Sequence, residues 1–96
     1  MTDAQLLELL KSDLGEPNAS ATRVLFLEQK IREAKSFIEQ EGIKLTVPYS
    51  YEDAGLVIMY AAFLVRKRAT SEGLPRYLRW ALNNRLMHEK GRVENV

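Results

Sequence analysis

The 96-residue sequence predicts a single all-α domain, a four-helix bundle whose third helix is central and whose C-terminal segment is mobile. Three observations lead to this prediction. Apolar residues recur at spacings of three and four, capping and turn residues separate the segments that carry them, and no two alternating runs are available to pair as strands. The hydrophobic content of 46% and charged content of 28% are those of a globular chain with one core.

The first helix is predicted over residues 3–14. Thr2 stands at the N-cap position, and Gln5, three residues later, completes a capping box. Gly15 supplies a left-handed position at which the helix ends. One apolar stripe faces the core, made by Leu6, Leu7, Leu10 and Leu14.

The second helix is predicted over residues 21–41, where the amphipathic pattern is clearest. Its apolar stripe has the spacing of a helix packed against another helix and consists of Val24, Leu27, Ile31, Ala34 and Ile38. Gly42 fits the left-handed position after its end. Residues 43–49 alternate apolar and polar, but Pro48 interrupts them, so we expect an extended linker instead of a strand.

The third helix is predicted over residues 51–68, with Ser50 as its N-cap and acidic residues in its first turn. Its last turn is basic, with Arg66, Lys67 and Arg68. Residues 56–65 are apolar on every side, which indicates a helix surrounded by the others. Gly55 lies inside this helix at a cost of about 1 kcal/mol relative to alanine. We expect close approach of a neighbouring helix there.

The fourth helix is predicted over residues 75–90, after a turn at residues 70–73, with Pro75 at its first position. Its core face consists of Leu74, Leu78, Ala81, Leu82 and Leu86. Trp80 is also expected in the core, because aromatic residues at helical spacing are usually buried. A different face carries Arg76, Arg79, Asn83 and Lys90. Residues 91–96 have no pattern and are expected to be mobile.

The residues offer little for catalysis or metal binding. With no Cys and one His, disulfides are excluded and a zinc site is disfavoured. The single imidazole, His88, is expected to be exposed near the end of the last helix, and no Gly-rich loop is present for a phosphate. We therefore predict a protein without enzymatic activity, cofactor or metal. The start lacks signal-peptide features and residues 56–65 are too few to cross a bilayer, which favours a soluble protein in a reducing cytosol.

Charge is unevenly distributed along the chain although the net charge is only +1. Residues 1–16 carry one cation and four anions, hence −3, and residues 66–92 carry eight cations and two anions, hence +6. Such polarity orients identical subunits head to tail or attracts an acidic partner such as DNA. For residues 66–68 the alternative to a nucleic-acid patch is a set of cations that favours a helix C-terminus.

The pair Asn83-Asn84 has no capping role so deep in a helix, where Asn is a mediocre helix former. This mismatch indicates hydrogen bonds between subunits. The aromatic side chains of Tyr77 and Trp80 could alternatively stack on bases or anchor a protein interface.

Three stretches of the chain resemble the small head-tail connector proteins of tailed bacteriophages, also known as DNA-packaging proteins. The most specific are Val57-Ile58-Met59-Tyr60-Ala61-Ala62-Phe63-Leu64-Val65-Arg66-Lys67-Arg68 and, after it, Glu72-Gly73-Leu74-Pro75-Arg76 with Leu78-Arg79-Trp80-Ala81-Leu82-Asn83-Asn84-Arg85-Leu86. The earlier residues Ile31-Arg32-Glu33-Ala34-Lys35, Ile38-Glu39 and Glu41-Gly42-Ile43 are similar to the family too. The sequence departs from the pattern at Tyr77, where we expect Met.

This resemblance implies a structural virion protein. Proteins of this family dock as a ring on the portal protein after DNA packaging, and the ring is expected to be dodecameric here. The ring extends the DNA channel and offers a platform to the tail or the next head-completion protein. The implied location is the virion, after assembly in the host cytoplasm. Under this hypothesis the candidate intersubunit or channel residues are Arg66, Arg68, Arg76, Arg79, Asn83, Asn84 and Arg85.

Two other classes remain open at this stage. The +6 charge of residues 66–92 is also typical of a small helical DNA-binding protein, although no helix-turn-helix pattern is recognisable. A helical adaptor or an antitoxin-like inhibitor is compatible with the bundle, but no residue signature favours it.

Overall fold

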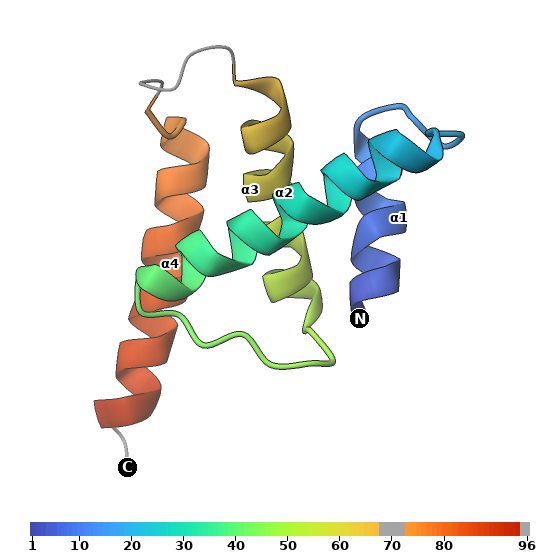
Figure 1. Cartoon of the computed structure of the whole chain (residues 1–96). Helices are drawn as coiled ribbons and strands as arrows, with labels where there is room; N and C mark the ends of the chain where they lie inside the picture. Colours follow the sequence, from blue (N-terminus) through green and yellow to red (C-terminus); the bar gives the residue numbers. More distant parts are fainter. Residues whose placement is uncertain (68–72, 95–96) are drawn as a thin grey trace.

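The computed structural model describes residues 1–67 and 73–94, and this part of the chain contains four α-helices and no strand (Figure 1). Their bounds are α1 (Asp3–Asp13), α2 (Ala21–Gln40), α3 (Tyr51–Arg66) and α4 (Arg76–Glu94). The predicted all-α class with four helices is therefore confirmed.

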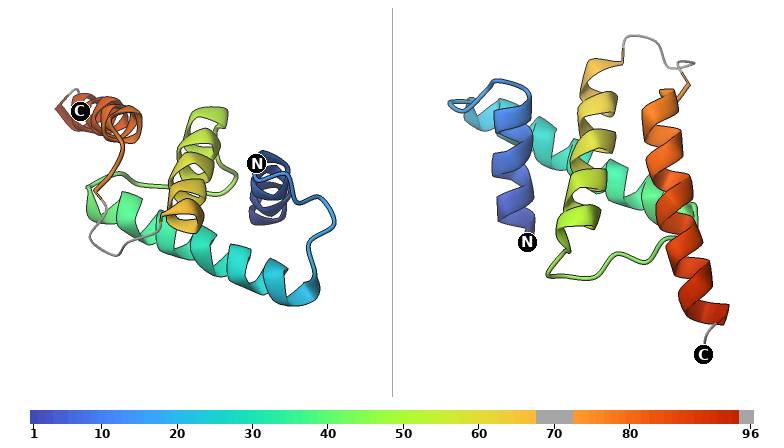
Figure 2. Two further views of the ribbon diagram at one scale, coloured as in Figure 1. Left: turned by 90° about the horizontal axis from the view of Figure 1, so that it is seen from above. Right: turned by 180° about the vertical axis from the view of Figure 1, so that it is seen from behind.

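The helices form two layers. Figures 1 and 2 show α1, α3 and α4 side by side in a row, with α2 crossing that row on one face. The chain forms a slab with principal extents of 46 × 31 × 17 Å. Helix α3 lies in the middle of the row and contacts all three other helices, so the prediction of a central third helix is confirmed.

Local side-chain bonds explain where α1 and α3 begin. The Thr2 backbone N–H donates to Gln5 Oε1 at 2.9 Å, and the Gln5 N–H donates to Thr2 Oγ1 at 3.3 Å, which completes the predicted capping box. The Asp53 N–H donates to Ser50 Oγ at 3.1 Å, as expected for the cap of α3. Each bond satisfies a backbone N–H that has no partner within its helix.

Glycines in the left-handed conformation follow α1 and α2. Gly15 has φ 72° and Gly42 has φ 104°, as the sequence predicts. After α1 the Glu16 N–H donates to the Lys11 carbonyl oxygen at 2.8 Å and the Gly15 N–H to that of Ser12 at 3.1 Å, the pair of bonds that defines a Schellman cap.

The bounds of α4 differ from the prediction at both ends. Pro75 precedes the helix, and its carbonyl oxygen accepts the Arg79 N–H at 3.0 Å, so it has the cap position instead of the first helical position. The helix continues past Lys90 to Glu94, and its predicted end was wrong because residues 91–94 carry no apolar pattern that marks them as helical. Helix α3 ends at Arg66, two residues before its predicted end, because the backbone of Lys67 is already extended. Arg68, most of the predicted turn and residues 95–96 lie outside the described residues.

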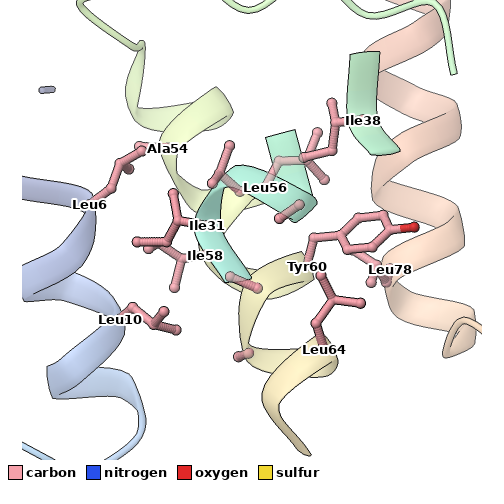
Figure 3. Packing of buried hydrophobic residues seen from close by; sticks show 14 of the residues in the cluster. Leu6, Leu10, Ile31, Ile38, Ala54, Leu56, Ile58, Tyr60, Leu64 and Leu78 are labelled. Carbon is pink, nitrogen blue, oxygen red and sulfur yellow. The ribbon is translucent and has the colours of Figure 1, made fainter. Parts of the chain in front are cut away.

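The core lies between the two layers (Figure 3). The predicted stripes of α1 and α2 supply fully buried Leu6, Leu10, Leu27 and Ile38, and α4 supplies Leu78 and Leu82. Most of α3 is buried, as expected for the central helix. Burial of each large side chain stabilises the fold by about 1.5–3 kcal/mol before conformational entropy is subtracted.

The linker of residues 43–49 has no regular secondary structure, as predicted, but both of its ends are buried. Tyr49 is 5% exposed, and its hydroxyl donates to Asp3 Oδ1 at 2.9 Å. The Lys35 ammonium donates to the same carboxylate at 2.9 Å and to the Tyr49 hydroxyl at 3.1 Å. The hydrogen bond from Lys35 lowers the pKa of the Asp3 carboxyl. These bonds connect α1, α2 and the linker.

Gly55 does not have the role expected of it. It is exposed, and no heavy atom lies within 4 Å of the position that a Cβ would occupy, so the predicted close approach of a neighbouring helix is wrong. Gly55→Ala is therefore expected to raise the free energy of unfolding by about 1 kcal/mol, since alanine favours the helix and meets no obstacle. Urea unfolding followed by circular dichroism measures this gain, and an unchanged midpoint would contradict it.

Candidate subunit interface

The predicted interface residues do not share one surface. Arg76 and Asn83 are exposed on α4, and Asn84 is half-buried. Arg66 is the last residue of the central helix α3, and its guanidinium reaches the Asp13 carbonyl oxygen of α1 at 3.2 Å and the Asp13 carboxylate at 3.6 Å. Arg68 lies outside the described residues.

Arg79 is exposed but already has a partner within the subunit. Its Nη1 lies 3.0 Å from Oε1 of Glu41, the residue after α2. The pair holds the start of α4 against the end of α2. Because both side chains are partly solvated, the ion pair contributes little to stability.

Arg85 is buried, so its prediction as an interface or channel residue is corrected. Its guanidinium donates to both Asp53 oxygens, at 2.7 and 3.3 Å, to Glu89 Oε2 at 2.8 Å and to the Lys44 carbonyl oxygen at 3.2 Å. These bonds join α3, α4 and the linker. The hydrogen bonds to Asp53 are the main reason why the pKa of the Arg85 guanidinium is raised above its ordinary value.

Asp53 is the ion-pair partner of Arg85, and the sequence did not identify it as such. We expected only a favourable charge in the first turn of α3, whereas its carboxylate is the main partner of a buried cation. No local pattern relates positions 53 and 85. The burial of Arg85 had a signal, however, because it continues the spacing of the buried residues Leu78 and Leu82.

Trp80 is 68% exposed, and its predicted place in the core is wrong. The buried positions of α4 are Leu78, Leu82 and Arg85, and the indole of Trp80 lies on the opposite side of the helix. Tyr77 and Met87 are exposed as well, by 57% and 68%. Burying these side chains in a contact with another molecule would remove large apolar areas from water.

The exposed residues of α4 form a regular stripe, which we name the α4 seam. It consists of Arg76, Trp80, Asn83, Met87 and Lys90, all exposed. The successive spacings of four, three, four and three residues are those of a helix that packs lengthwise on another helix. Nothing among the described residues covers the seam.

A groove of about 470 Å³ runs between α3 and α4 beside the seam. Its lining includes Leu56, Met59, Trp80, Asn84 and His88. His88 is exposed, as expected, and its Nδ1 lies 3.7 Å from Glu52 Oε1. Apolar and polar side chains both line the groove, which is half open to solvent.

Within residues 1–67 and 73–94, no group of three or more His, Cys, Asp or Glu side chains is placed to hold a metal ion. Among these same residues no helix is long and apolar enough to cross a membrane.

Comparisons with known proteins give no relative. No protein-family model matches the chain, and neither the curated proteins nor the solved structures include a significant match.

Proposed function

We propose that this protein is a head-tail connector subunit of a tailed bacteriophage, which assembles as a ring on the portal protein, extends the DNA channel and joins the head to the tail. The observation that carries the proposal is the residue pattern of positions 57–86, which resembles that family over α3 and most of α4. An uncovered α4 seam on a stable helical core supports it, because a ring subunit needs exposed contact faces more than a catalytic pocket.

If the protein is a connector subunit, we expect the double variant Arg76→Glu/Arg79→Glu to be excluded from viral heads. Two basic side chains at the start of α4 become acidic, so a contact with an acidic surface turns repulsive. The measurement is the amount of the variant that purifies with heads assembled in cells lacking the wild-type chain.

The matched control is Arg32→Glu, which reverses a charge on the exposed face of α2. This control is expected to be incorporated normally. Thermal unfolding of the purified variants checks that both remain folded, since the loss of the Arg79–Glu41 pair costs little. Normal incorporation of the folded double variant would remove the proposed role of these arginines.

DNA binding is the rival function, and the positions of the cations weigh against it. Arg66, Arg79 and Arg85 each bond to a carboxylate of the same chain, which leaves less charge for phosphates. A short duplex titrated at several salt concentrations separates the two functions. The connector proposal expects weak binding or none, whereas tight binding with a steep salt dependence would favour the rival.

A further inference from the structure

We infer that the α4 seam is a contact for a second copy of this chain, and that it receives the outer face of α1 from that copy. The α1 outer face consists of the exposed residues Gln5, Glu8, Leu9, Ser12 and Asp13. This inference rests on the proposed connector role in one respect: a ring needs two unlike contact faces on each subunit.

The two surfaces lie on opposite edges of the molecule. Figures 1 and 2 show α1 and α4 at the two ends of the row α1–α3–α4. A second copy that sets its α1 beside α4 continues the row and leaves one edge of each copy free. Such a head-to-tail contact repeats with each added copy, and a constant rotation between copies closes it into a ring.

Both surfaces have the pattern of packed helices. On α1, Gln5, Leu9 and Ser12 follow one another at spacings of four and three, as in the seam. Leu9 is 39% exposed and is an apolar partner for Trp80. In both stripes polar residues flank the apolar ones, which favours one register of the two helices over others.

Charge favours α1 as the occupant. The α1 outer face carries two carboxylates, Glu8 and Asp13, and no cation, whereas the α4 seam carries two cations, Arg76 and Lys90, and no carboxylate. Arg76 and Lys90 stand at the two ends of the seam. The side chains of Glu8 and Asp13 are 71% and 48% exposed, so each retains oxygens for a second partner although it already has one in its own chain. Two α4 seams facing each other would instead bring like charges together.

The test is cross-linking of cysteines introduced at chosen positions, because the natural chain has none. The double variant Ser12→Cys/Asn83→Cys carries one thiol on each proposed surface. A bis-maleimide reagent of flexible length is added at the highest soluble protein concentration, and the products are separated by denaturing electrophoresis. We expect dimers, trimers and larger species from the double variant, and only dimers from a mixture of the two single variants.

The matched control is Ser36→Cys/Asn83→Cys, which moves one thiol to an exposed position on α2. The inference would be overturned if the Ser12→Cys/Asn83→Cys variant cross-linked no more than this control. It would also be overturned if Asn83→Cys alone gave dimers at the same yield as the Ser12→Cys/Asn83→Cys variant, because two seams would then meet. Adding Trp80→Ala to the Ser12→Cys/Asn83→Cys variant is expected to abolish the trimers and larger species, and their persistence would also overturn it.

Incorporation into viral heads is scored separately for the same Ser12→Cys/Asn83→Cys variant. Incorporation without specific cross-linking would retain the connector role and reject the contact between the two edges. Specific cross-linking without incorporation would retain the contact and reject the connector role.

Discussion

Asp53→Ala is expected to lower the free energy of unfolding by about 3 kcal/mol, because it leaves a buried guanidinium without its main partner. The Arg85 side chain is 8% exposed and cannot reach bulk water without displacing the core around it. Glu89 and the Lys44 carbonyl remain as partners, which limits the loss. Urea unfolding followed by circular dichroism measures the change, which is a large share of the stability of a small domain.

Glu52→Ala is the matched control for this prediction. Glu52 stands in the same first turn of α3 but is exposed, so its removal is expected to cost less than about 1 kcal/mol. The pair Asp53→Ala/Arg85→Met is expected to regain part of the loss, because it removes the unpaired charge along with its partner. Equal effects of Asp53→Ala and Glu52→Ala would show that the buried ion pair does not hold α3 and α4 together.

Leu27→Ala is expected to cost about 2–5 kcal/mol. Leu27 is fully buried on α2, the helix that crosses the row, and its truncation leaves a cavity that the surrounding helices fill only in part. Leu25→Ala, two residues earlier on the same helix, is the matched control because Leu25 is 67% exposed. Differential scanning calorimetry of both variants checks the prediction. Similar melting temperatures for Leu27→Ala and Leu25→Ala would contradict the packing of α2 across the row of helices.

The sequence predicted well those features that depend on neighbouring residues. The capping box at Thr2, the cap at Ser50 and the left-handed Gly15 and Gly42 are local, since each depends on bonds within one or two turns. The apolar stripes of α1 and α2 also depend only on spacing. The class, the order of the helices and the central place of α3 follow from these local patterns.

Features that depend on contacts between distant residues were predicted less well. Arg85 was assigned to an interface by its charge, whereas its partner Asp53 lies 32 positions away and makes burial of the charge possible. Trp80 was assigned to the core by its type, but Leu78, Leu82 and Arg85 occupy the buried face of α4. The end of α4 was misplaced because residues 91–94 carry no apolar pattern that marks them as helical.

These findings change the set of residues that can form the proposed interface. Of the predicted set, Arg76 and Asn83 lie in the α4 seam, Arg79 and Asn84 lie beside it on the same helix, and Arg85 stabilises the subunit from within. Trp80 and Met87 join the seam although the charge pattern gave no reason to select them. The surface that remains is part apolar and part basic.

Electron microscopy of this protein mixed with the portal protein of the same virus tests the connector role most directly. The connector role predicts extra density that forms a closed ring of α-helical subunits on the portal, coaxial with its channel. The far side of this ring should have an uncovered surface for the tail. Portal particles that look the same with and without an excess of the folded protein would contradict it.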